Sequence, residues 1–133
     1  MKKIVMLLLC TFLFGAEYRD FAKTMTYETE YKTALNKAKK EDKKLMVLMI
    51  SNFCPWCTKF ENKTLADESV DIAVKSKYIP LIINKEEKNF PAYLTTPIVP
   101  TTYFINPNKE EILHQSVGFS NKVEFLNLLQ KLK

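Results

Sequence analysis

The chain has 133 residues, which is the size of one domain. Hydrophobic residues make up 47% of it, so it can bury a full core, and its mixed charges argue against disorder. Only one of its 20 basic residues is an arginine, Arg19, and 15 acidic residues oppose them. The sequence therefore lacks the Arg-rich patch that would indicate nucleic-acid binding.

The first residues read "MKKIVMLLLCTFLFGAE". Two lysines, an apolar run of about a dozen residues and a small-residue end are typical of a secretory signal. We therefore expect a signal peptide over residues 1–16, with cleavage after Ala16, and a single domain over residues 17–133. An uncleaved membrane anchor is the alternative. A lipoprotein site at Cys10 is disfavoured, because Leu9 stands where a small residue is needed.

Hydrophobic periodicity predicts the elements of this domain. The runs 45–51 and 78–84 are continuously apolar, as in strands buried on both faces of a sheet. The segment 111–117 alternates and forms a hairpin with its predecessor. Ser120 is the expected cap of the last helix, with Val123, Leu126, Leu129 and Leu132 on its apolar face. The first predicted helix carries an apolar face from Tyr27 to Ala38 and starts at Thr26 or Thr29. It is followed by strand 45–51, helices 55–63 and 68–76, strand 78–84, a turn-rich segment, strands 101–106 and 111–117, and a final helix. This order predicts an α/β fold with a central mixed sheet and helices on both faces.

Cys54 and Cys57 lie three positions apart in "SNFCPWCTKF". Removal of the signal would leave them as the only cysteines. A disulfide that closes so short a loop stabilises a fold little, so a structural staple is disfavoured. A zinc site needs more ligands than these two cysteines and the distant His114, so we expect no metal and no cofactor. A redox pair is the remaining interpretation.

Four features resemble thioredoxin-fold thiol-disulfide oxidoreductases. They are a strand that runs into CxxC ("LMVLMISNFCPWC"), a proline before a strand ("IVPTTYFIN"), a hairpin that ends in glycine ("EILHQSVG") and an amphipathic last helix ("FLNLLQKL"). Together they cover most of residues 27–133. Within the family, the chain is most similar to exported thioredoxin-like proteins and to the C-terminal domain of DsbD-type transporters. The resemblance implies a thioredoxin-like fold.

A cysteine at a helix N-terminus is a suitable nucleophile, because the helix dipole and unpaired N–H groups stabilise its thiolate. Cys54 is therefore the expected nucleophile, and Cys57, one turn later, the resolving thiol. Pro55 suits the first turn of a helix. Trp56 is expected to be exposed beside the site. Family analogy makes it a tuner of the redox potential or a contact for partners, and a simple packing role is the alternative.

The resemblance also implies that Pro100 follows a cis peptide bond and lies against the dithiol. An ordinary trans proline is the alternative, and Pro97 is a competing candidate that lacks a strand directly after it. Val99 would then offer its backbone N–H and C=O to an extended substrate segment. Phe53, which precedes the motif, is expected to contribute to substrate binding. Leu48 stands where thioredoxin carries a buried aspartate, so the usual proton acceptor for Cys57 is missing, and Glu61 or a bound water is the candidate substitute.

The sequence thus predicts an exported thiol-disulfide oxidoreductase that reduces or exchanges disulfides of periplasmic proteins. No cation lies between the cysteines, which disfavours a strong oxidant. Expected partners are exported protein thiols and disulfides and a membrane thiol electron donor or acceptor, and we expect a monomer. A disulfide-forming oxidase of the DsbA type and a non-catalytic peptide-binding or chaperone module are the alternatives.

Overall fold

The computed structural model describes residues 16–132. Residues 1–15, with most of the predicted signal peptide and with Cys10, lie outside the described residues, so export and cleavage after Ala16 stay predictions. The described elements are α1 (Ala16–Met25), α2 (Tyr31–Glu41), β1 (Lys44–Ile50), α3 (Pro55–Phe60), a π-helical turn (Glu61–Leu65), α4 (Glu68–Lys77), β2 (Tyr78–Asn84), a 3-10 turn (Lys85–Glu87), β3 (Thr101–Asn106), β4 (Glu111–Val117) and α5 (Lys122–Lys131).

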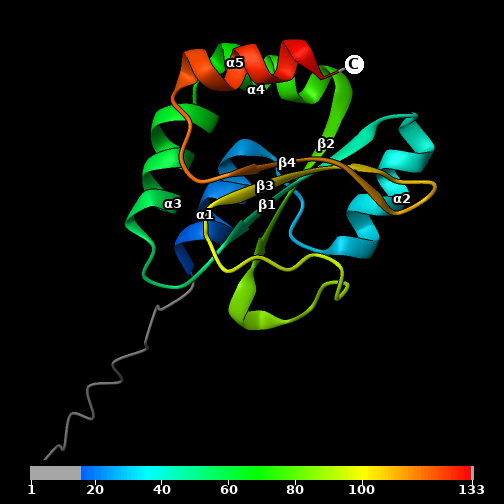
Figure 1. The fold of residues 1–133 in the computed structure, drawn as a ribbon, viewed down its shortest axis with the longest axis horizontal. Helices are drawn as coiled ribbons and strands as arrows, with labels where there is room; N and C mark the ends of the chain where they lie inside the picture. Colours follow the sequence, from blue (N-terminus) through cyan, green and yellow to red (C-terminus); the bar gives the residue numbers. More distant parts are fainter. Residues whose placement is uncertain (1–15, 133) are drawn as a thin grey trace, which may run out of the picture.

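Four strands form one mixed sheet in the order β2-β1-β3-β4 (Figure 1). β1 pairs in parallel with β2 and antiparallel with β3, and β3 pairs antiparallel with β4. The predicted mixed sheet is therefore confirmed. Pro80 is tolerated inside β2 because this strand is at the edge of the sheet, where a missing N–H breaks no ladder.

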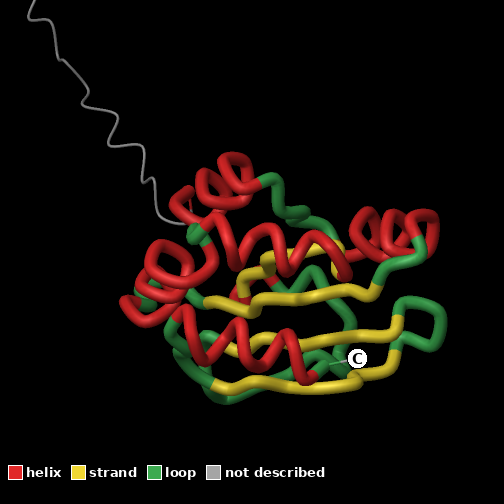
Figure 2. Tube along the Cα trace, turned by 90° about the horizontal axis from the view of Figure 1, so that it is seen from above, coloured by secondary structure: helices red, strands yellow, loops and turns green. Residues whose placement is uncertain are grey.

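Helices cover both faces of the sheet (Figure 2). Alternate residues of β1 belong to two separate core clusters, as a strand's two-residue period requires. Met46, Leu48 and Ile50 face a cluster that contains side chains of α1, α3, α4 and α5. Leu45, Val47 and Met49 instead pack with α2. The apolar run that predicted β1 is thus buried on both sides.

The sequence prediction missed helix α1. Its Tyr18 and Ala22 are buried in the same cluster as Leu48. Arg19 forms an ion pair with Glu87 at 3.0 Å, which joins α1 to the 3-10 turn after β2. Among residues 16–132, no helix combines the length and the apolar character needed to cross a membrane.

Three chain segments meet at one end of the sheet. β1 ends where β2 ends, since Ile50 pairs with Asn84. β3 runs the opposite way and begins there, since Met49 pairs with Thr101. This end therefore gathers the loop 51–53 before Cys54, the turn 85–87 and the segment that leads into β3.

Candidate active site

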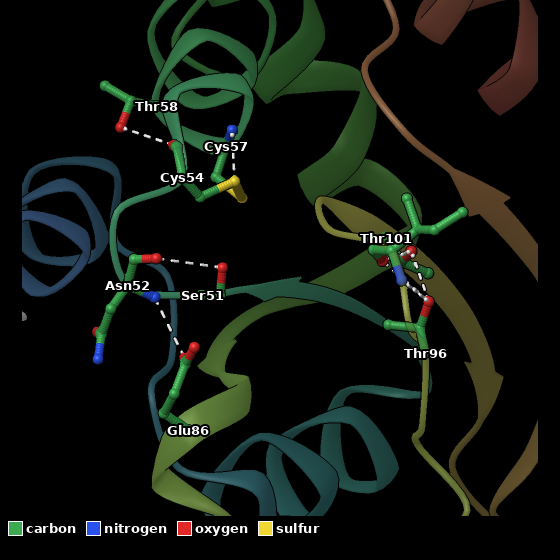
Figure 3. The surroundings of a disulfide bond; sticks show 9 residues. Ser51, Asn52, Cys54, Cys57, Thr58, Glu86, Thr96 and Thr101 are labelled. Carbon is green, nitrogen blue, oxygen red and sulfur yellow. Dashed lines mark hydrogen bonds between the residues drawn. A yellow bond between two sulfur atoms is a disulfide. The ribbon is translucent and has the colours of Figure 1, made fainter.

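Cys54 and Cys57 are joined by a disulfide at the start of α3, with their Cα atoms 5.2 Å apart (Figure 3). Cys54 is the N-cap residue of this helix, and its Sγ atom accepts a hydrogen bond from the N–H of Cys57 at 3.1 Å. Cys54 is partly exposed, whereas Cys57 is only 3% exposed. An accessible sulfur at a helix N-terminus and a buried partner suit the roles of attacking and resolving thiol.

The two residues between the cysteines are both exposed. Pro55 occupies the first helical position, where its missing N–H leaves no hydrogen bond unmade. Trp56 is 56% exposed, and its ring lies 5.6 Å from that of Phe119. The ammonium of Lys59 lies over both rings, 4.7 Å from the centroid of Trp56 and 5.0 Å from that of Phe119. Trp56 thus packs on one side and stays open to solvent.

The segment before β3 contains the cis peptide bond Val99–Pro100. Two threonines hold its shape: Thr96 and Thr101 each donate a hydrogen bond to the carbonyl of Ile98, at 2.9 and 2.6 Å. Figure 3 draws both threonines in the surroundings of the disulfide. Val99 is half-buried, and its N–H and C=O form no hydrogen bond with other residues of the range 16–132. This backbone is compatible with the prediction that Val99 pairs with an extended substrate segment.

Leu48 is fully buried in the cluster that contains Cys57. Because its side chain is apolar, this position cannot accept a proton from Cys57. Glu61 is the nearest carboxylate along the chain, one turn after Cys57, and its N–H bonds to the carbonyl of that residue. It is only 5% exposed. Burial raises the pKa of Tyr27, and the negative charges of Asp71 and Glu61 raise it further, so Glu61 borders the core near this phenol.

The predicted helix over 55–63 changes type within its span, because α3 ends at Phe60 and a π-helical turn continues to Leu65. Such turns carry one extra residue and are frequent at functional sites. This turn buries Glu61, Thr64 and Leu65. Thr64 donates a hydrogen bond to the carbonyl of Ser120 at 2.6 Å, which ties the active-site helix to the segment before α5.

Two exposed apolar side chains lie at the same end of the sheet as the dithiol: Phe53 directly before Cys54, and Ile98 in the segment before β3. Phe53 is 80% exposed and Ile98 is 52% exposed. Sequence reasoning named Phe53 but missed Ile98 and Phe119, which no local pattern marks. His114 lies on β4, where its ring is 6.0 Å from that of Phe104. Within residues 16–132, no group of three His, Cys, Asp or Glu side chains could hold a metal ion.

Comparisons with known proteins agree with this architecture. The family model of the thioredoxin-like domain matches residues 31–133, so the chain belongs to the thioredoxin-like family. No curated protein matches it. Helix α1 precedes the matched region, so the family model does not cover it.

Solved structures share the fold at low sequence identity. A thioredoxin from Thermus thermophilus is 22% identical with a TM-score of 0.69, over 80% of this chain and 85% of that one. The oxidised DsbD C-terminal domain of Neisseria meningitidis is 17% identical with a TM-score of 0.64, over 80% and 99% of the two chains. A disulphide isomerase from Xylella fastidiosa is 15% identical with a TM-score of 0.63, over 76% and 86%. At these identities the likeness shows the fold alone.

Proposed function

We propose that this chain is a thiol-disulfide oxidoreductase that reduces or exchanges disulfides of exported proteins. One observation carries the proposal: a disulfide joins a partly exposed cysteine at the N-terminus of α3 to a buried cysteine one turn later. The cis Val99–Pro100 step, whose backbone we propose to pair with a substrate segment, precedes β3 at the same end of the sheet. The names of the similar structures, among them a disulphide isomerase and a DsbD domain, point the same way.

The reduced form acts through Cys54. Its thiolate attacks one sulfur of a substrate disulfide, a mixed disulfide forms, and the other substrate sulfur leaves as a thiolate that takes up a proton. Cys57 then loses its proton, for which Glu61 is the proposed acceptor, and attacks the Sγ atom of Cys54. The second substrate thiol leaves, two electrons have passed to the substrate, and the Cys54–Cys57 disulfide is formed.

We favour the reducing direction. A strong oxidant stabilises the thiolate of its reduced form, for which a cation near the nucleophile is effective. Pro55 and Trp56 between the cysteines supply none, and the ammonium of Lys59 lies over the Trp56 and Phe119 rings. Each turnover then needs a fresh electron pair, for which a membrane thiol donor is the proposed source.

We place this activity in the periplasm. The proposal rests on the basic and apolar residues 1–16, which are typical of a signal peptide. If they are removed, the N-terminal residue of protein recovered from the periplasm is Glu17. N-terminal sequencing of that fraction checks this, and a chain that still begins at Met1 there would support the uncleaved anchor instead.

The activity is tested by reduction of a model protein disulfide. We expect Cys54→Ser to abolish turnover, because it removes the attacking sulfur. We expect Cys57→Ser to accumulate a mixed disulfide with the substrate, because resolution is lost, which non-reducing gel electrophoresis detects. Equal turnover by wild type and Cys54→Ser would contradict the proposal and favour a non-catalytic peptide-binding module.

A further inference from the structure

The loop that presents Cys54 has an unusual backbone. It covers residues 51–53 between β1 and α3, and its last residue, Phe53, has a φ of +54° although it is not a glycine. A bulky residue adopts this left-handed region only when its surroundings hold it there. Other contacts must therefore fix the residues immediately before Cys54.

Asn52, Asn84 and Glu86 form a closed ring of three hydrogen bonds at this loop. Asn84 donates through Nδ2 to Oδ1 of Asn52 at 2.8 Å. The N–H of Asn52 donates to Oε2 of Glu86 at 3.1 Å, as Figure 3 shows. The N–H of Glu86 donates back to Oδ1 of Asn84 at 3.0 Å. The ring joins the Cys54 loop to the end of β2, which lies beside the end of β1.

Other parts of the fold hold the β2 side of this ring in place. Asn84 is only 2% exposed and belongs to a strand of the sheet. The neighbouring Glu87 accepts hydrogen bonds from the Tyr18 hydroxyl at 2.6 Å and from Arg19 at 3.0 Å, both on α1. The turn 85–87 is thus held from two sides and can serve as a fixed support for the loop.

Three cations on elements next to this loop contact groups outside it. Lys59 on α3 lies over the rings of Trp56 and Phe119. Arg19 on α1 pairs with Glu87. Lys85 of the turn donates a hydrogen bond to the carbonyl of Thr96 at 3.1 Å. The carboxylate of Glu86 instead contacts the loop itself, two residues before Cys54.

We propose that Glu86, supported by Asn84, is a positioning residue for Cys54 and that its negative charge opposes formation of the Cys54 thiolate. The inference rests on the proposed function and deepens it. A fixed loop keeps the Cys54 sulfur at the N-terminus of α3. A negative charge held on the loop two residues before Cys54 disfavours the thiolate of the reduced form, so it shifts the pair toward the reducing direction.

Two variants separate the two effects. Glu86→Gln keeps an oxygen acceptor for the N–H of Asn52 but removes the charge. We expect it to lower the apparent pKa of Cys54, measured from the pH dependence of alkylation of the reduced protein, and to react with a model disulfide at least as fast as wild type. Glu86→Ala also removes the acceptor. We expect its rate at a pH where Cys54 is fully ionised to fall about fivefold, the change expected when one ordering hydrogen bond is lost.

Glu87→Gln is the matched control: it makes the same change in charge one residue away without a contact to the loop, and its amide oxygen can still accept the hydrogen bonds from Tyr18 and Arg19 that hold the turn. We expect it to shift the pKa of Cys54 less than Glu86→Gln does. Equal shifts in both variants, or wild-type pKa and rate in Glu86→Ala, would overturn the inference. The alkylation readout needs no substrate, so it stands even where wild type fails to reduce the model disulfide, a result that would refute the proposed function alone.

Discussion

At the scale of single residues, the environment of the dithiol is asymmetric. On α3, Trp56 leans on Phe119 with the Lys59 cation over both rings. On the loop side, the carboxylate of Glu86 holds the backbone of Asn52. Aromatic rings hold a cation through their π-electrons, at about 0.5–1 kcal/mol for an exposed pair. The positive charge is thus tied to the rings, whereas the negative one contacts the loop that carries the nucleophile.

The two interpretations of Trp56 are therefore compatible. Its packing on Phe119 fixes the ring, and its 56% exposure leaves a face for a partner. A pre-ordered aromatic surface costs little conformational entropy when a partner binds. Phe53 and Ile98 extend the exposed apolar surface at this end of the sheet. This arrangement suits the extended substrate segment that we propose to pair with Val99.

At the scale of elements, helix α4 depends on one charged cap. Asp67 accepts hydrogen bonds from the N–H groups of Ser69 at 2.9 Å and Val70 at 3.3 Å. Its other oxygen pairs with Lys122 at 2.9 Å, which joins the starts of α4 and α5. The hydrogen bond from the Ser69 hydroxyl, followed by that from the Lys122 ammonium, lowers the pKa of Asp67 from 3.8 to about 2. The ionised carboxylate therefore stabilises the fold.

This cap predicts a specific acid sensitivity. The folded-state pKa lies below the ordinary value, so the stabilisation is complete above the ordinary value of 3.8 and disappears as the pH falls toward 2. Asp67→Asn keeps a capping oxygen but loses the charge. We expect its melting temperature to be below that of wild type near pH 7 and equal to it near pH 2, in thermal unfolding followed by circular dichroism.

Glu68→Gln is the control for this comparison, because it removes a neighbouring charge in the first turn of α4 without touching the cap. We expect its difference from wild type to be small at both pH values. A difference between wild type and Asp67→Asn that persists unchanged at low pH would show that the charge of Asp67 does not provide the stabilisation.

At the scale of the whole molecule, the sequence specified the sheet better than the helices. Strands over 78–84 and 101–106 were predicted at their observed bounds, because buried apolar runs mark them directly. In α5, however, Asn121 and not Ser120 is the cap, and Val123 is 66% exposed. Its buried side chains are Phe125 and Leu129, so the predicted face was only partly right. A short helix rich in leucine presents several apolar stripes, and packing against α4 and the π-helical turn selects among them.

Some parts of the candidate site could be predicted from the sequence and others could not. The CxxC pair and the Val99–Pro100 step are contiguous motifs, so the sequence displays them. The ring of Asn52, Asn84 and Glu86 joins positions more than 30 residues apart, and none of its members is chemically unusual. Among residues 18–25 of helix α1, whose burial the structure describes, only Tyr18 and Ala22 are buried, too few to stand out beside an apolar leader. Contacts between distant segments create these features, and periodicity does not report them.

The direction of electron flow is a property of the whole fold. A thermodynamic cycle links the potential of the folded pair to the difference in stability between the disulfide and dithiol forms, with 30 mV equivalent to about 1.4 kcal/mol. A fold that does not favour the Cys54 thiolate stabilises the disulfide relative to the dithiol. The short loop makes this effect modest, so we expect the oxidised form to be more stable by about 1 kcal/mol.

Urea unfolding of the oxidised and reduced protein measures the difference. A chain with both cysteines changed to serine must unfold identically with and without reductant. A reduced form more stable than the oxidised one would reverse the proposed direction and favour a disulfide-forming oxidase.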